Sequence, residues 1–240
     1  MDIGPNRDLV GDLAKEVKQV ISPHTNLPLK FGLYHSLYEW YNPMYLNDKV
    51  NNFTTQQFVT TKTIPELYDL VRQYEPELIW SDGDWEVHSD YWQAREFLHW
   101  YTNQSTVAST AVYNDRWGSD VLCQHGSFLT CSDKYNPNQL QLRKYENAFT
   151  IDVSSWGYNR NIHNNVSRYY LTTQEIIHTI VQVVAFNGNV LLNIGPNADG
   201  TIDPIFLDRL NNIGTFVTVA YSGIFAHSVT NHQCSFGAGR

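Results

Sequence analysis

The sequence predicts an α/β protein whose parallel strands and helices form part of a (β/α)8-like, TIM-type barrel. Segments typical of strands and helices alternate along most of the 240 residues, which is the pattern of βαβ units. Polar residues follow the ends of the predicted strands, whereas the strand bodies are apolar, as in barrel enzymes whose chemistry lies at the carboxyl ends of the strands. A doubly wound open sheet would show the same alternation, but its usual G-x-G-x-x-G or Walker A motif is absent.

The first half of the chain contains three predicted strands, each preceded by a helix. Leu9, Leu13 and Val17 recur at helical spacing, and Pro65 occupies the first turn of a second helix. The region 37–62 has no clear period and is predicted to be a loop. The predicted elements are a helix at 8–20, a strand at 30–36, a helix at 65–74, a strand at 77–82, a helix at 90–103 and a strand at 110–116.

The second half begins with a long predicted loop over 117–147. A strong helical period then ends at Gly188, a residue type that often terminates helices. The predicted elements are a strand at 148–155, a helix at 173–188, a strand at 189–195 and a last helix marked by Phe206, Leu210, Ile213 and Val217. We therefore expect one partial barrel over 1–229, followed by an atypical tail over 230–240 whose lack of any period is typical of disorder.

Charge and composition disfavour several classes of partner. Asp and Glu number 24 against 16 Lys and Arg, and the net charge of -8 argues against binding to nucleic acid or anionic membranes. No apolar stretch is long enough to predict a membrane span. The 7 Trp and 15 Tyr residues suit a protein core, and they equally suit sugar binding, because an aromatic face stacks on the apolar face of a pyranose.

Cysteine and histidine spacing predicts no metal site, and no cofactor is expected. The chain lacks a CxxC pair, and its 9 His residues include no H-x-x-x-H pair. Cys123 and Cys131 could close a short loop by a disulfide in a secreted protein, and Cys234 would then have no cysteine to pair with. Three N-x-[ST] triplets lean toward a secretory route, although the first residues do not form a signal peptide.

The stretch ELIWSDGDWE, residues 77–86, places a cluster of acids directly after an apolar strand. Hydrolysis of a glycosidic bond needs two carboxyl groups, and a side chain at a strand end is held rigidly enough for the first of them. Asp82 takes this position, and Asp84 is expected in the following loop. A polar turn or a helix N-cap explains Asp82 equally well from spacing alone.

The second carboxyl group should come from a loop that faces the same strand ends. The loop after the third strand offers Asp120, Asp133 and Glu146, and spacing does not choose among them. An acid near aromatic residues has its pKa raised, as a general acid requires. Each of the three also fits the ordinary role of a solvated loop charge.

Three further residues at strand ends are candidates for sugar binding. Arg116 can hydrogen-bond a sugar hydroxyl or pair with Asp82, and its alternative is a structural salt bridge with Asp115. Tyr34 and His35 end the first strand and can donate to a ring hydroxyl. The alternative for His35 is a satisfied structural histidine.

Six segments in order resemble the α-L-fucosidases of glycoside hydrolase family 29, with the animal lysosomal branch most similar. The resemblance runs from Met1 to about residue 228. The segments are GPNRDLVGDLAKEVK, KFGLYHS, ELIWSDGDWE, VYNDRWG, SSWGYNRN and LLNIGPNADGTI.

The resemblance implies retaining hydrolysis of terminal α-linked L-fucose through a covalent glycosyl-enzyme. It assigns the nucleophile to Asp82, which ends the W-S-D strand, and sugar binding to Arg116 and Tyr34. It favours Asp133 as the acid/base, with Glu146 as the rival. It further implies fucosylated glycans as partners, a homo-oligomeric intact protein and a lysosomal or secreted location.

Parts of the family pattern are missing from this sequence. The family's early strands, which supply a His pair for fucose, and its C-terminal β-sandwich have no match here. Met1 resembles an internal position, so we expect the chain to be a fragment. An inactive remnant and a fucose- or glycan-binding module are the alternatives to an active hydrolase.

Overall fold

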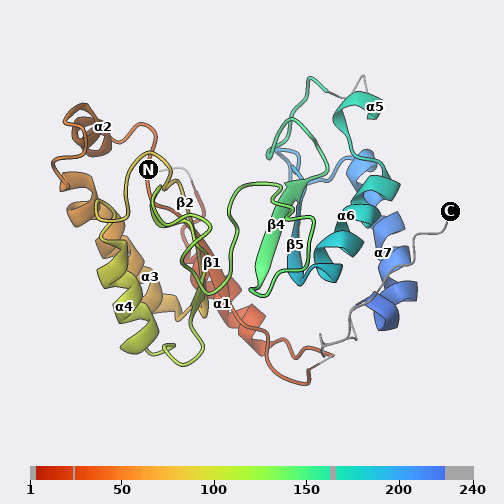
Figure 1. Ribbon diagram of the computed structural model, residues 1–240, viewed down its shortest axis with the longest axis horizontal. Coiled ribbons are helices and arrows are strands. Elements are labelled where there is room, and N and C mark those ends of the chain that lie inside the picture. The colour runs from red at the N-terminus through yellow and green to blue at the C-terminus, as the bar shows by residue number, and fades with distance from the viewer. Residues whose placement is uncertain (1–3, 24, 163–165, 225–240) are drawn as a thin grey trace. The chain divides into compact units, whose positions relative to one another are not determined.

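The computed structural model describes residues 4–23, 25–162 and 166–224. The chain divides into two compact units, Met1–Cys131 and Ser132–Arg240, and each is described by itself (Figure 1). The predicted tail at 230–240 lies outside the described residues. In the described part, no helix is both long and apolar enough to cross a membrane.

The first unit contains a three-stranded parallel sheet. Its strands are β1 (Gly32–Ser36), β2 (Leu78–Asp82) and β3 (Val112–Tyr113), in the order β1-β2-β3. The register aligns the last residues of β1 and β2 as a pair, Ser36 with Asp82. Because all three strands run the same way, their carboxyl ends meet at one edge, as expected for βαβ units.

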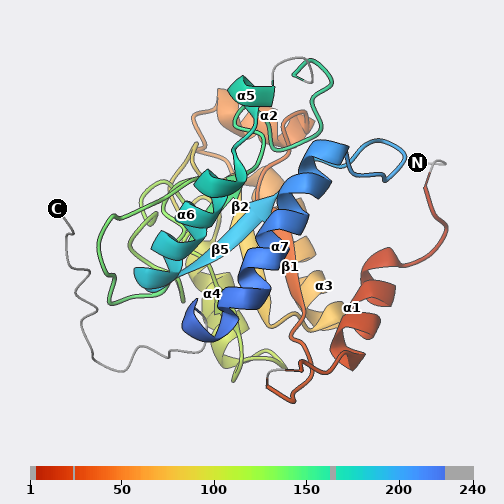
Figure 2. The ribbon, with the colours of Figure 1, turned by 90° about the vertical axis from the view of Figure 1, so that its right-hand side faces the viewer.

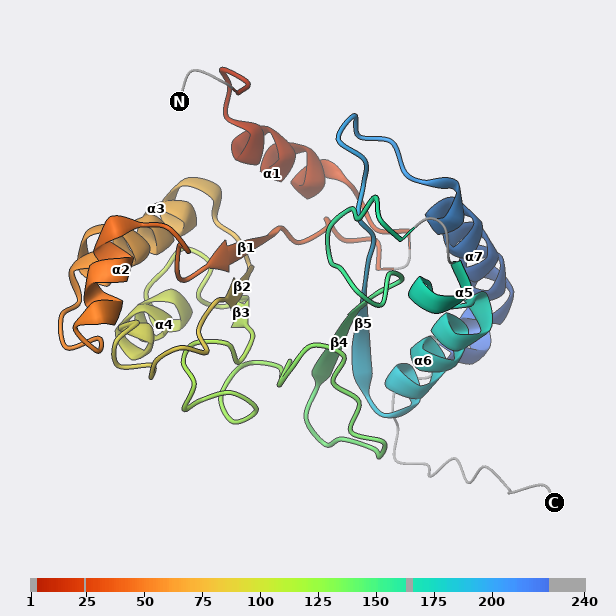
Figure 3. The same ribbon diagram turned by 90° about the horizontal axis from the view of Figure 1, so that it is seen from above.

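Helices cover one face of this sheet. The helices α3 (Ile64–Tyr74) and α4 (Ala94–Asn103) lie on the same side of the strands, as Figure 3 shows. The helix α1 (Leu9–Gln19) begins where the Asp8 side chain accepts a hydrogen bond from Gly11, which stabilises the first turn. The buried core of this unit is rich in aromatic residues, among which the largest are Trp92, Trp117, Tyr45, Tyr101 and Phe97.

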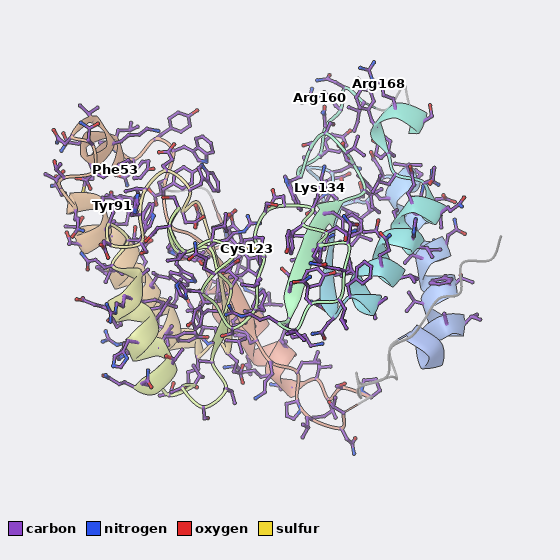
Figure 4. All side chains as sticks on the ribbon, viewed as in Figure 1. Phe53, Tyr91, Cys123, Lys134, Arg160 and Arg168 are labelled. Atoms are coloured by element: carbon purple, nitrogen blue, oxygen red, sulfur yellow. A yellow bond between two sulfur atoms is a disulfide. The ribbon has the colours of Figure 1, made fainter. Side chains whose placement is uncertain are left out.

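The prediction of a loop over 37–62 is wrong. This region contains the helix α2 (Pro43–Val50) and a π-helical turn at Val59–Thr63 that leads into α3. The α2 helix has Asn42 as its N-cap and Pro43 in its first turn, a combination that starts a helix without apolar periodicity. Tertiary contacts complete it. The buried Asp48 carboxylate accepts a hydrogen bond from Tyr91, whose ring packs on Phe53 at 4.9 Å (Figure 4).

The second unit contains a two-stranded parallel sheet covered by helices. The strands β4 (Tyr145–Thr150) and β5 (Gly188–Asn193) pair along their full length. The helices α6 (Thr173–Ala185) and α7 (Pro204–Ile224) pack beside each other and on the sheet (Figure 2). Thr172 and Glu175 form a reciprocal capping box at the start of α6, which fixes its first turn. A short helix, α5 (Val166–Tyr169), was not predicted.

Two strand boundaries differ from the prediction. The strand expected at 110–116 is only Val112–Tyr113, and the strand expected at 148–155 is Tyr145–Thr150. The predicted 117–147 loop therefore ends three residues earlier, and Glu146 lies in a strand. The run from Tyr145 to Thr150 is buried at every position, so it lacks the alternation that marks a half-exposed strand.

In each unit, one face of the sheet remains uncovered by helices. Residues of β1 alternate between exposed and partly buried, with Gly32, Tyr34 and Ser36 exposed. Alternate residues of a strand point to opposite faces, and paired residues of neighbouring strands point to the same face. Asp82, which pairs with Ser36, therefore lies on the uncovered face.

Candidate active site

Asp82 is the last residue of β2, and a tight turn follows it. Gly83 has φ of +76°, in the left-handed region that favours glycine. A Cβ at Gly83 would lie 2.2 Å from the ring of Tyr38, so a side chain there would displace the ring. The Leu37 N–H donates to the Asp82 carbonyl at 2.7 Å. The backbone on both sides of the Asp82 carboxylate is thus fixed.

Both carboxylate oxygens of Asp82 accept hydrogen bonds from side chains. The Tyr34 hydroxyl donates to Oδ2 at 2.8 Å, and Nη1 of Arg116 donates to Oδ1 at 3.1 Å. The Asp82 side chain is 20% exposed and that of Arg116 is 8% exposed. Partial burial, together with the bond to Asp82, raises the pKa of the Tyr34 phenol above its ordinary value. Tyr34 therefore stays a proton donor at neutral and acidic pH.

Trp80 lies between the two donors that bind Asp82. The Arg116 guanidinium sits over the Trp80 ring at 4.7 Å, and the Tyr34 ring stacks on Trp80 with centroids 5.6 Å apart. A cation over an aromatic face is held by electrostatic attraction. The three side chains and Asp82 form one connected group on the uncovered face of the first sheet.

The side chain of Asn114 extends the short pairing between β3 and β2. Its side-chain amide accepts from the Ser81 N–H at 3.1 Å and donates to the Ser81 carbonyl at 2.8 Å. These are the bonds that a backbone peptide group would form in a parallel ladder. The side chain of Asn114 thus continues the pairing of β3 with β2 up to the residue before Asp82.

The other acids near this edge have structural partners. The Asp84 carboxylate is buried and accepts from the Gly118 N–H at 2.9 Å; burial raises its pKa. Asp120 accepts from the backbone N–H and the hydroxyl of Ser89, at 2.7 and 2.9 Å. Asp84 lies in the loop, as predicted, and both carboxylates fasten loops to one another.

His35 lies on the opposite face of β1 from Tyr34. Its Nε2 is 3.6 Å from the Glu66 carboxylate of α3, and its buried Nδ1 has no hydrogen-bond partner. Burial lowers the pKa of His35, and the nearby Glu66 opposes this shift. The structure therefore brings Tyr34 and Arg116 onto Asp82 and places His35 beside a helix.

In the second unit, Asp133 lies on an exposed turn. The Lys134 N–H donates to the Ala148 carbonyl of β4 at 2.8 Å, and the backbone N–H of Tyr135 donates to the Ser132 carbonyl at 3.2 Å. Lys134, labelled in Figure 4, has φ of +59°. The turn that carries Asp133 is thus attached to β4.

Glu146 is the second residue of β4 and is 8% exposed. It pairs in register with Asn189, whose side-chain amide lies 3.5 Å from its carboxylate. This position is near the amino end of the strand, whereas barrel chemistry lies at the carboxyl ends. The prediction that Glu146 lies in a loop was wrong, and its role as the acid/base stays a prediction.

Cys123 and Cys131 form a disulfide within the first unit (Figure 4). The described residues contain no group of three or more His, Cys, Asp or Glu side chains arranged to hold a metal ion.

Sequence reasoning did not assign Trp80 and Thr130 to this site. Trp80 lies two residues before Asp82 on the same face of β2, and this spacing was the available signal. Thr130 carried no signal, because its contact with Arg116 (Nε to Oγ1, 3.0 Å) joins residues 14 apart across a loop.

Comparisons with known proteins place this geometry in context. Residues 1–221 match the family model described as Alpha-L-fucosidase. The chain is 47% identical over 225 residues to tissue α-L-fucosidase of Rattus norvegicus and 46% identical over 225 residues to plasma α-L-fucosidase of Homo sapiens. It covers 46% of each, and 94% of this chain is aligned. It is also similar to the Thermotoga maritima α-fucosidase in complex with fucose, with a TM-score of 0.66, 29% identity, and coverage of 95% of this chain and 49% of that one. The chain therefore spans about half the length of these relatives.

Proposed function

Because the chain belongs to the α-L-fucosidase family, we propose that it carries the nucleophile and the acid/base of a retaining α-L-fucosidase. The proposed architecture is part of a (β/α)8 barrel over 1–229. The coarser α/β character, with parallel strands and helices in alternation, is what the structure shows.

The arrangement of Asp82 carries the proposal. A nucleophilic carboxylate must remain ionised, reachable and fixed in direction. Arg116 supplies a positive charge to one oxygen, and Tyr34 supplies a neutral donor to the other. The position at the carboxyl end of a parallel strand is where barrel enzymes carry their catalytic groups.

The proposed reaction has two displacements at the anomeric carbon. In the first, an Asp82 oxygen forms a bond to that carbon while the bond to the leaving oxygen breaks, and Asp133 gives its proton to that oxygen. In the second, Asp133 takes a proton from water, whose oxygen displaces Asp82 and releases fucose. Retention predicts carboxyl groups about 5–5.5 Å apart in the intact enzyme.

The proposed substrates are terminal α-linked L-fucosides of glycoproteins or glycolipids. Trp80 and Tyr34 offer an apolar surface beside Asp82 on which the C6 methyl of fucose would pack, and a galactose hydroxyl there would lose its hydrogen-bond partners. A lysosomal or secreted location and a homo-oligomeric intact protein complete the proposal. Relatives named for tissue and plasma support the location.

The direct test assays the chain with a nitrophenyl α-L-fucoside and compares three substitutions. Asp82→Gly should abolish turnover, and added azide should restore it by attacking the anomeric carbon from the vacated side, which gives an inverted fucosyl azide. Asp133→Asn should slow poor leaving groups far more than nitrophenolate, which needs little protonation. Glu146→Gln removes the same charge from β4 and serves as the matched control.

Three results would overturn parts of the proposal. If the wild type and Asp82→Gly both show only the background rate, this chain does not hydrolyse the fucoside. If the chain binds fucose but does not turn over the fucoside, it is a glycan-binding module and not a hydrolase. A leaving-group dependence found in Glu146→Gln and absent from Asp133→Asn would reassign the acid/base to Glu146.

A further inference from the structure

We propose that Thr130 and Asp115 are positioning residues that hold the Arg116 guanidinium against Asp82. The inference rests on the proposed function for its catalytic meaning. Its geometry stands independently, because all four residues belong to the first unit and their contacts are direct.

Arg116 is held at two separate points of its guanidinium. Nη1 donates to the Asp82 carboxylate, and Nε donates to Oγ1 of Thr130 at 3.0 Å. The guanidinium is planar and presents its donors in a fixed fork. With Nε held by Thr130, rotation about the side-chain axis would break one bond or the other, so the direction of Nη1 is determined.

The hydroxyl of Thr130 is itself oriented by a buried carboxylate. Thr130 Oγ1 donates to Oδ1 of Asp115 at 2.5 Å, and the same oxygen accepts from Nε of Arg116. A hydroxyl has one proton and two lone pairs. Because the proton is used on Asp115, a lone pair of Thr130 must face Arg116. Both Thr130 and Asp115 are fully buried, so water does not compete for these bonds.

Asp115 also holds the loop that carries Thr130 in place through backbone hydrogen bonds. Its carboxylate accepts from the backbone N–H groups of Cys123, Thr130 and Cys131 at 2.9, 2.8 and 3.1 Å. The disulfide joins Cys123 to Cys131 across the same loop. The three backbone donors fix the loop to Asp115, and the disulfide closes the same loop. Together they restrict the position of Thr130 far more than a free loop would.

The alternative expected from the sequence, a salt bridge between Arg116 and Asp115, is replaced by an indirect link. Asp115 reaches Arg116 through the hydroxyl of Thr130, and the direct carboxylate partner of Arg116 is Asp82. The contacts thus run from Asp115 through Thr130 and Arg116 to Asp82. Asp115 and Thr130 are both buried, so their effect on Asp82 passes through Arg116.

The test replaces Thr130 by valine, which keeps the shape and removes the hydroxyl, and by serine, which keeps the hydroxyl. We expect Thr130→Val to lower kcat about tenfold with a smaller change in KM, as for a lost transition-state contact, and Thr130→Ser to restore most of it. Ser89→Ala is the matched control, because Ser89 anchors the same loop through Asp120 and does not touch Arg116. A Ser89→Ala effect equal to that of Thr130→Val would reduce the role of Thr130 to loop stability.

A second readout does not depend on turnover. The Arg116 Nε–H signal in a nitrogen–proton correlation spectrum, identified by its loss in Arg116→Lys, should exchange slowly with water in the wild type and Thr130→Ser. It should exchange rapidly in Thr130→Val. If the wild type is inactive and this pattern holds, the positioning stands and the proposed function fails. Unchanged exchange in Thr130→Val overturns the inference in either case.

Discussion

At the scale of single residues, Asp82 differs from the acids around it in what surrounds its oxygens. Asp84 and Asp120 accept from backbone N–H groups and bind loops together. Asp82 accepts only from side chains in the contacts described above, Tyr34 and Arg116, and stays partly accessible. A partly accessible carboxylate whose charge is balanced by a fixed guanidinium and a phenol suits a group that forms and breaks a bond.

Removal of the Tyr34 hydroxyl tests this description. In Tyr34→Phe the ring still stacks on Trp80, but Oδ2 of Asp82 loses its donor. We expect kcat/KM to fall about tenfold, which corresponds to about 1.4 kcal/mol, with only a small change in melting temperature because Tyr34 is 62% exposed. Steady-state kinetics and thermal unfolding measure the two quantities.

Tyr41→Phe is the matched control for this substitution. Tyr41 is 91% exposed, and it undergoes the same chemical change without contact to Asp82. An equal loss in both variants, or none in Tyr34→Phe, would contradict the role given to Tyr34.

The residue that sequence could place was the one with a local signal. Asp82 ends an apolar strand and Arg116 follows another, so spacing placed both at strand ends, and the family resemblance assigned their roles. Trp80 reads as core from its neighbours, and Thr130 depends on a contact formed only when the loop folds. His35 illustrates the reverse case: adjacent to Tyr34 in sequence, it points to the other face because strand residues alternate.

At the scale of elements, the Glu86 carboxylate fastens α2 to the loop after β2. Glu86 accepts from the Tyr45 hydroxyl at 2.6 Å and from Lys49 Nζ at 2.7 Å, both on α2. Partial burial would raise the pKa of Glu86, but the bonds from Lys49 and Tyr45 outweigh it and hold the pKa below its ordinary value. This link connects an unpredicted helix to the turn beside Asp82.

The lowered pKa of Glu86 predicts a pH dependence of stability. A group whose folded pKa is depressed contributes stability above its unfolded pKa, about 4.3 for Glu, and loses it as pH falls through the folded pKa. Glu86→Gln should therefore lower the free energy of unfolding by roughly 1 kcal/mol at pH 6, and the difference should shrink below pH 4. Urea unfolding at pH 3 to 6 measures this.

Glu16→Gln, on the exposed side of α1, is the control and should follow the wild type across this range. A Glu86→Gln difference that stays constant with pH, or grows toward acid, would contradict the link.

Helices with an apolar period were predictable, and elements fixed by capping or burial were not. The helices α1, α3, α4 and α6 lie within a few residues of their predicted ranges. The helix α2 starts from Asn42 and Pro43 and holds its place through Tyr45 and Asp48. The strand β4 is buried on both faces, so no alternation marks where it begins.

At the scale of the whole molecule, each unit covers its sheet with helices on one face only. Asp82 lies on the face of the first sheet that helices leave uncovered, and such a face points inward in a closed barrel. The chain spans about half the length of its relatives, and the proposed barrel follows from that family membership together with these one-sided sheets.

The central claim is that Asp82 forms the bond to the anomeric carbon, and covalent trapping tests it most directly. The chain would be incubated with 2-fluoro-fucosyl fluoride, digested and mapped by mass spectrometry. We predict one fluorofucosyl group per chain, on Asp82, and none in Asp82→Asn. An adduct on Asp84, Asp133 or Glu146, or one that persists in Asp82→Asn, would contradict the account.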